Sequence, residues 1–311
     1  MTSVDKEDIG KVLNDQSRPL KERFRALFTL RNLGGKDSID MIAQSFQDGS
    51  ALLKHELAYC LGQMQDEYAI PVLTGVLEDK NQEAMVRHEA GEALGAIGSS
   101  DVMHILEKYS ADPVTEVAET CQLAIARLKW LQNSQNEKDN LSENPYLSVD
   151  PAPPETRDSD TQHLTTTLLD ENLPLFERYR ALFSLRNMGT TESVVALAKG
   201  LKCKSALFRH EIAYVLGQVQ HDACIKQLTE NLKDPEENPM VRHECAEALG
   251  SIATDECMKI LHEYLKDKER VVKESCEVAL DMCEYEKSTD FQYADTMAKL
   301  KQGENLMTAG D

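Results

Sequence analysis

The chain has 311 residues, enough for about two domains and a substantial hydrophobic core. Its net charge of −20 and pI near 4.8 disfavour nucleic acid as a ligand and favour a cationic partner. No apolar run approaches the roughly 20 residues that would span a bilayer, and the N-terminal sequence MTSVDKEDIGKVL lacks the features of a secretory signal. We therefore expect a cytoplasmic monomer without a membrane or nucleic-acid partner.

The first 132 residues carry four copies of one helical pattern. The four windows are FRALFTLRNL, KHELAYCLGQ, VRHEAGEALGAI and ETCQLAIARL, and they follow one another at intervals of about 31 to 33 residues. In the third window Val86, Ala90, Leu94 and Ile97 lie on one face of a helix. A second apolar stretch, such as AIPVLTGVL, lies between successive windows. Residues 1–132 are therefore predicted to form four helical hairpins.

Residues 133–162 have a different composition. Between Asn133 and Asp160 there are seven acidic residues, two basic residues and four prolines. Such a segment favours a flexible linker, because it offers little apolar surface to bury. It is long enough to let the parts of the chain on either side of it face each other.

Residues 163–290 repeat the first part of the chain at a shift of 155 positions. The block SRPLKERFRALFTLRNLG recurs as NLPLFERYRALFSLRNMG with 12 of 18 positions identical, and SALLKHELAYCLGQMQ recurs as SALFRHEIAYVLGQVQ with 11 of 16. The fold is therefore predicted to be all-α, an α-solenoid of eight helical-hairpin repeats in two pseudo-symmetric halves of four. Residues 291–311 have weak periodicity and are expected to form a C-terminal tail.

At one equivalent position of the repeat, a His-Glu dipeptide occurs in the two central repeats of each half and not in the flanking repeats. The four dipeptides are His55-Glu56, His88-Glu89, His210-Glu211 and His243-Glu244. They are related both by the spacing of 33 residues and by the shift of 155, whereas His104, His163, His221 and His262 have no histidine at the shifted position. The inert alternative, that duplication merely copied a surface dipeptide, leaves this confinement unexplained.

Equivalent positions of adjacent repeats face the same way on helices about 10 Å apart. His55 and His88 can therefore point at one ion, and His210 and His243 can do the same from the other half. If the linker lets the halves face each other, both histidine pairs and the four carboxylates converge on one cavity. Nitrogen and carboxylate ligands without thiolate suit iron or manganese. We predict a two-iron site, with a two-zinc hydrolytic centre as the alternative.

Further candidate residues lie one helical turn after the histidines. Glu92 and Glu247 follow His88 and His243 by four residues, and Tyr59 and Tyr214 follow His55 and His210 in the same way. These four residues either contact the ligands or substrate, or simply pack. The glycine of each Leu-Gly pair either permits close helix packing or ends its helix; these glycines are Gly62, Gly95, Gly217 and Gly250.

The order of KHELAYCLGQ, VRHEAGEALGAIG, RHEIAYVLGQ and VRHECAEALGSI resembles the deoxyhypusine hydroxylase family over nearly the whole chain. The resemblance implies HEAT-like repeats and a two-iron monooxygenase that uses O2. Its substrate would be the deoxyhypusine side chain of translation initiation factor 5A. The resemblance also implies that the four His-Glu motifs, all intact here, hold two Fe(II) ions per chain.

The four glutamates outnumber what two metals with open positions need. By the symmetry of the duplication, Glu56 shares a role with Glu211, and Glu89 with Glu244. Glu89 and Glu244 are predicted to bind iron, while Glu56 and Glu211 receive the cationic arm. Two rival functions stay open at this point: a metal-free HEAT-repeat scaffold that binds proteins, and a protein like the bilin lyases, which share such repeats.

Overall fold

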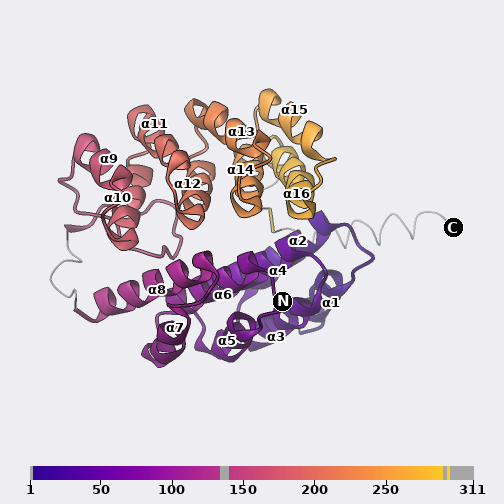
Figure 1. The fold of residues 1–311 in the computed structure, drawn as a ribbon. Coiled ribbons are helices and arrows are strands. Elements are labelled where there is room, and N and C mark those ends of the chain that lie inside the picture. Colours follow the sequence, from indigo (N-terminus) through magenta and orange to yellow (C-terminus); the bar gives the residue numbers. More distant parts are fainter. Residues whose placement is uncertain (1–2, 134–139, 290–292, 295–311) are drawn as a thin grey trace.

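The computed structural model describes residues 3–133, 140–289 and 293–294, and most of them are helical (Figure 1). The first half consists of α1 (Ser3–Asn14), α2 (Leu20–Leu33), α3 (Lys36–Gln44), α4 (Ala51–Met64), α5 (Ile70–Glu78), α6 (Ala84–Ile97), α7 (Met103–Tyr109) and α8 (Thr115–Asn133). The second half consists of α9 (Thr161–Leu169), α10 (Leu175–Met188), α11 (Thr191–Lys199), α12 (Ala206–Val219), α13 (Ile225–Lys233), α14 (Pro239–Ile252), α15 (Asp255–Tyr264) and α16 (Arg270–Glu286). Short 3-10 turns join some of these helices, namely η1 (Ser45–Gln47), η2 (Glu67–Ala69), η3 (Ser100–Val102), η5 (Gly200–Lys202) and η6 (Asp222–Cys224).

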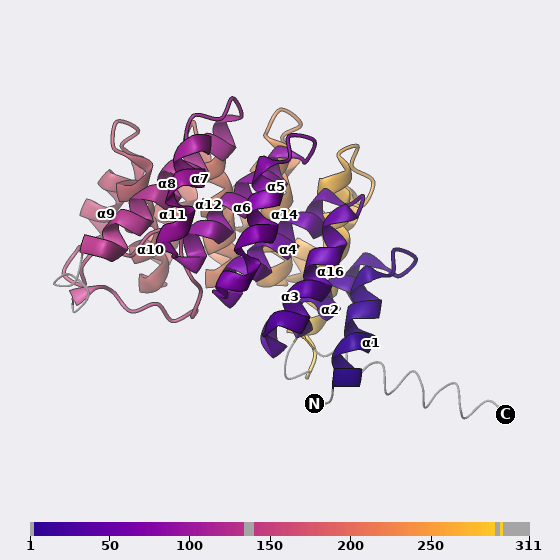
Figure 2. The same ribbon diagram turned by 90° about the horizontal axis from the view of Figure 1, so that it is seen from below.

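The helices form eight hairpins, each with an odd-numbered outer helix and an even-numbered inner helix. In both halves the inner helices pack side by side in chain order, and each outer helix packs on its own inner helix. The halves face each other through their inner helices, with α2 against α16 and α8 against α10. Figure 1 shows the halves as two layers, and in Figure 2 the first half lies in front of the second. The prediction of an all-α solenoid in two halves of four repeats is confirmed.

The inner helices approach one another closely at glycine. A Cβ atom added to Gly62 of α4 would lie 2.7 Å from the Cα of Ala93 in α6, and one added to Gly217 of α12 would lie 3.0 Å from the Cα of Ala248 in α14. These distances leave no room for a side chain. The glycines therefore serve helix packing, since α4 itself ends beyond Gly62, at Met64.

A buried arginine fixes the rotation of both inner helices that carry the second motif of their half. The Nε atoms of Arg87 and Arg242 donate hydrogen bonds of 2.9 Å to the carbonyl oxygens of Leu77 and Leu232, on the preceding outer helices. Each guanidinium also pairs with an aspartate, Asp112 in the first case. Because these arginines directly precede His88 and His243, the same contacts set the direction of the histidines.

Residues 140–160 contact both halves. Val149 exchanges two backbone hydrogen bonds with the side-chain amide of Gln63 on α4, at 2.9 and 3.1 Å. Asp150 forms a buried ion pair of 2.7 Å with Arg186 on α10. The linker thus lies against the inner helices at these points. Its flexibility and its bounds at residues 133 and 162 stay predictions. Among the described residues no helix is long and apolar enough to cross a membrane.

Candidate metal centre

The central inner helices α4, α6, α12 and α14 each contribute one His-Glu dipeptide. In α4 the hydroxyl of Ser50 accepts a hydrogen bond from the backbone N–H of Leu53, and in α12 Ser205 caps Phe208 in the same way, both at 3.1 Å. These N-caps define where the helices begin. As a result, His55 and His210 stand at equal depth along their helices.

The four imidazole rings form a single cluster where the halves meet. Within a half, the ring centres of His55 and His88 are 5.5 Å apart, and those of His210 and His243 are 5.3 Å apart. Between the halves, His55 lies 5.2 Å from His243, and His88 lies 5.3 Å from His210. All four residues are at most 5% exposed. The structure therefore brings the four predicted histidines together across the duplication, not in two separate pairs.

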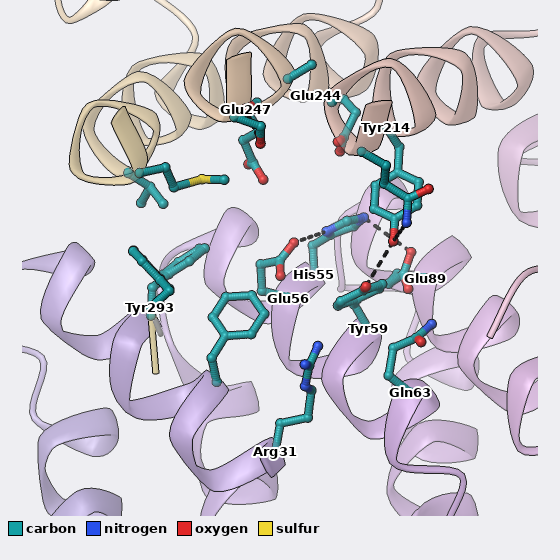
Figure 3. Close-up of a pocket in the computed structure, with 18 of the residues that line it drawn as sticks. Arg31, His55, Glu56, Tyr59, Gln63, Glu89, Tyr214, Glu244, Glu247 and Tyr293 are labelled. Atoms are coloured by element: carbon teal, nitrogen blue, oxygen red, sulfur yellow. Dashed lines mark hydrogen bonds and ion pairs between the residues drawn. The ribbon is translucent and has the colours of Figure 1, made fainter. Parts of the chain in front are cut away.

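Two glutamates reach into this cluster in equivalent ways. The Oε2 of Glu89 lies 3.3 Å from the Nε2 of His55 (Figure 3). The Oε2 of Glu244 lies 3.2 Å from the Nε2 of His210. Glu56 approaches His55 from the other ring nitrogen, Nδ1, at 3.5 Å. Glu211 is buried and lines the same cavity.

The ring nitrogens fit a metal site because most of them make no hydrogen bond within the protein. Seven of the eight are buried and make no hydrogen bond, which includes the Nε2 atoms of His55 and His210 beside their glutamates. An unpaired buried polar atom costs about 1 to 3 kcal/mol, so such a number in one place calls for a ligand. Ligand atoms of His55, His88 and His210 lie within 4.8 Å of one another, as do those of His210, His243 and Glu244. The residues present therefore fit metal ions held by imidazole and carboxylate.

Electrostatics favours the same interpretation. Burial lowers the pKa values of His88 and His243 well below the usual range and that of His210 to about 3, so these rings are neutral and can donate lone pairs. Burial opposes protonation of His55 as well, but Glu89 and Glu56 outweigh it and raise its pKa. Burial also raises the pKa values of the carboxyl groups of Glu92, Glu211 and Glu247, and it raises that of Glu244 to about 8. Bound cations would favour the ionised form of these carboxyl groups.

The glutamate one turn after His243 orients that ring. Nδ1 of His243 lies 3.3 Å from the Oε1 of Glu247, which also accepts a hydrogen bond of 3.0 Å from the hydroxyl of Ser275. This contact occupies Nδ1 and leaves Nε2 facing the cluster. Glu92 lies within a compact group of potential ligand atoms with His88 and Glu89.

The two predicted tyrosines meet each other across the halves. Their hydroxyl oxygens, in Tyr59 and Tyr214, are 2.9 Å apart, and the side-chain amide of Gln218 donates a hydrogen bond of 3.0 Å to Tyr214. This pair lies one helical turn beyond His55 and His210, toward the C-terminal ends of α4 and α12. It forms part of the wall of the cavity.

A cavity of about 530 Å³ leads from the cluster toward the C-terminal ends of α2, α12, α14 and α16. The lining residues that were not predicted from the sequence include Arg31, Asp150 and Tyr293. Arg31 lies in a block of the duplication in which 12 of 18 positions are identical, which was a usable signal. Asp150 and Tyr293 fall in the expected linker and tail, where no repeat marks them.

Comparisons with known proteins agree with this architecture. A family model for HEAT repeats matches residues 39–126 and 194–281, and one for the PBS lyase HEAT-like repeat matches residues 177–203. Deoxyhypusine hydroxylase of Danio rerio is 64% identical over 294 residues, which are 94% of this chain and 96% of that protein. The Homo sapiens enzyme of the same name is 60% identical over 301 residues, which are 97% and 98% of the two chains.

The fold agrees as closely as the sequence. The solved structure of human deoxyhypusine hydroxylase in complex with glycerol matches with a TM-score of 0.87 and 61% identity, covering 91% of this chain and 98% of that one. These likenesses confirm the resemblance predicted from the four motifs. The chain belongs to the deoxyhypusine hydroxylase family.

Proposed function

We propose that this protein hydroxylates the deoxyhypusine side chain of a protein substrate, the deoxyhypusine form of translation initiation factor 5A. The observation that carries this proposal is the cluster of four buried imidazoles with unpaired ring nitrogens, at the inner end of a cavity in a chain of this family. A protein that served only as a binding scaffold would have no use for such a cluster.

The metal is proposed to be two Fe(II) ions, with O2 as co-substrate. His55, His88, His210 and His243 would hold the ions together with Glu89 and Glu244, the two carboxylates that approach a ring Nε2. When bound, such a centre supplies the redox chemistry by which one oxygen atom of O2 enters a C–H bond and the other leaves as water, with two electrons from an external donor.

The cavity is suited to a cationic arm. Glu56 and Glu211 line it, and the backbone carbonyls at the C-terminal ends of the inner helices give its outer part a negative potential. The chain also carries a net charge of −20, which would attract a positively charged substrate over a longer range. We assign to Glu56 and Glu211 the binding of the ammonium groups, which orients the arm along the cavity.

Other residues of the site hold its groups in place and limit the access of water. Glu247 holds the ring of His243 in one orientation. The hydrogen bond between Tyr59 and Tyr214 ties the two halves together next to the cluster and limits access of water there. These residues position groups, and we assign no proton transfer to them.

Turnover can be tested directly. The purified protein, loaded with Fe(II) and given a reductant and O2, is incubated with the deoxyhypusine-containing factor, and the substrate is analysed by mass spectrometry. The proposal predicts a mass gain of one oxygen atom, located on the modified lysine. A variant with His88→Ala is the matched negative control. Failure of the iron-loaded wild type to add oxygen would refute the proposed function.

A further inference from the structure

The duplication places two arginines in equivalent positions, 155 residues apart, on α2 and α10. Arg186 on α10 is fully buried, and its guanidinium binds Asp150 of the linker through two hydrogen bonds, of 2.9 Å to Oδ1 and 2.7 Å to Oδ2. This two-point contact is the strongest geometry that an arginine forms with a carboxylate. Arg186 therefore shows what this position of the fold recognises.

Two contacts of Arg186 recur around Arg31 on α2, whereas the hydrogen bonds of Arg186 to Ser148 and Gln218 do not. The guanidinium of Arg31 lies over the ring of Phe28 at 5.4 Å, and that of Arg186 lies over the equivalent Phe183 at 4.7 Å. Each arginine also donates two hydrogen bonds to the side-chain oxygen of the asparagine that follows it, at 3.3 and 3.2 Å for Arg31 and at 3.1 and 2.9 Å for Arg186. The aromatic and amide parts of the site are thus present twice.

The carboxylate is present only once. Within residues 3–133, 140–289 and 293–294, no aspartate or glutamate lies within ion-pair distance of Arg31. Arg31 is half-buried, lines the cavity and points into it between Glu56 and Tyr59 (Figure 3). Arg31 differs from Arg186 in this respect because a single linker joins the two halves, and its Asp150 can bind only one of the two equivalent arginines.

The cationic arm is a poor partner for Arg31, because two positive charges repel. The arm is attracted to the buried carboxylates deeper in the cavity, whereas Arg31 lies beside the exposed Asn32 at the cavity's edge. A group that meets Arg31 therefore belongs to a part of the substrate outside the arm.

We infer that Arg31 binds a carboxylate of the protein substrate near the modified side chain, in the way that Arg186 binds Asp150. This inference rests on the proposed function and adds a specificity-determining contact to it. The site recognises an aspartate or glutamate side chain that reaches the cavity's edge when the arm is inserted. An uncharged substituent at that place binds more weakly, since the guanidinium would lose its solvent without gaining a partner.

The test is steady-state kinetics of three variants on the intact protein substrate. Arg31→Ala should raise KM about tenfold with little change in kcat, because the contact is remote from the reacting carbon. Arg31→Lys should recover part of this loss, since it keeps the charge but not the two-point geometry. The control is Arg18→Ala, which removes the same charge from an exposed position near the start of α2 and should leave KM unchanged.

A second series identifies the carboxylate. Each surface aspartate or glutamate of the substrate protein near the modified lysine is changed to asparagine or glutamine, and KM is measured with wild type and with Arg31→Ala. One substitution should raise KM for wild type and have no further effect in Arg31→Ala, the pattern of a double-mutant cycle between partners in contact.

Three results would overturn the inference. The first is an unchanged KM for Arg31→Ala, and the second is an additive effect on KM for every substrate substitution. The third is a KM that falls when residues 295–311 are removed from the wild-type protein but does not fall when they are removed from Arg31→Ala. The last result would assign Arg31 to the acidic residues of the chain's own C-terminal segment. Iron content and wild-type turnover are measured alongside, so a failure of the proposed function is seen separately as absent turnover in wild type.

Discussion

Tyr59 and Tyr214 are 155 positions apart in the sequence, and their hydroxyl oxygens are 2.9 Å apart in space. Equivalent residues of the two halves thus contact each other, so the local twofold axis of the duplication passes between the two hydroxyls. The histidine cluster lies one helical turn away from this contact. The site is therefore built on the axis, where both halves contribute equally.

This tyrosine pair gives the first prediction. Tyr59→Phe removes one shared hydrogen bond and should lower the free energy of unfolding by about 1 kcal/mol. Tyr214→Phe should cost more, because it also removes the acceptor of Gln218. The double variant should equal Tyr214→Phe alone, since both changes remove the same contact. Urea unfolding measures all three, and additive losses would show that the hydroxyls do not bond to each other.

The second prediction concerns the linker. Asp150→Ala leaves the fully buried Arg186 without its counter-charge and should lower the free energy of unfolding by about 3 kcal/mol or more. Asp158→Ala, in the same segment but exposed, should change stability by less than about 0.5 kcal/mol. Equal stability of the two variants in thermal unfolding would mean that the linker acts only as a tether.

The third prediction concerns the histidines. Each of His55→Ala, His88→Ala, His210→Ala and His243→Ala should lower the iron content and abolish turnover, because each removes one imidazole from a shared cluster. His104→Ala and His262→Ala are controls at exposed positions and should do neither. Full iron content and activity in any of the first four variants would contradict the assignment.

The fourth prediction separates the glutamates by role. Glu89→Ala and Glu244→Ala should lose iron, because these carboxylates approach the ring nitrogens. Glu56→Ala and Glu211→Ala should keep iron and weaken substrate binding by at least about tenfold, since a desolvated ionic contact costs about 2 to 5 kcal/mol. Iron titration and substrate binding on all four variants decide the matter, and loss of iron from Glu56→Ala alone would reverse the roles.

Much of this architecture could be predicted from the sequence, because the same helical pattern recurs four times in each half. The position of the four histidines followed from their confinement to the central repeats. The convergence of both histidine pairs on one cavity was also predicted, because the linker is long enough to let the halves face each other. The close contacts between rings of different halves, such as that of His55 with His243, could not be predicted, because the sequence does not say which helices meet. Asp150 could not be found either: its role depends on where the linker crosses α10, and neither composition nor periodicity carries that information.

We propose that the four His-Glu motifs hold two iron ions on the axis between the halves. The most direct measurement is the number of irons bound per chain, determined by metal analysis after loading with Fe(II), for wild type and for His88→Ala. The wild-type chain should bind two irons, and the variant should bind fewer while its helical content is unchanged. Wild-type protein that binds no iron, or a variant that keeps both ions, would contradict it.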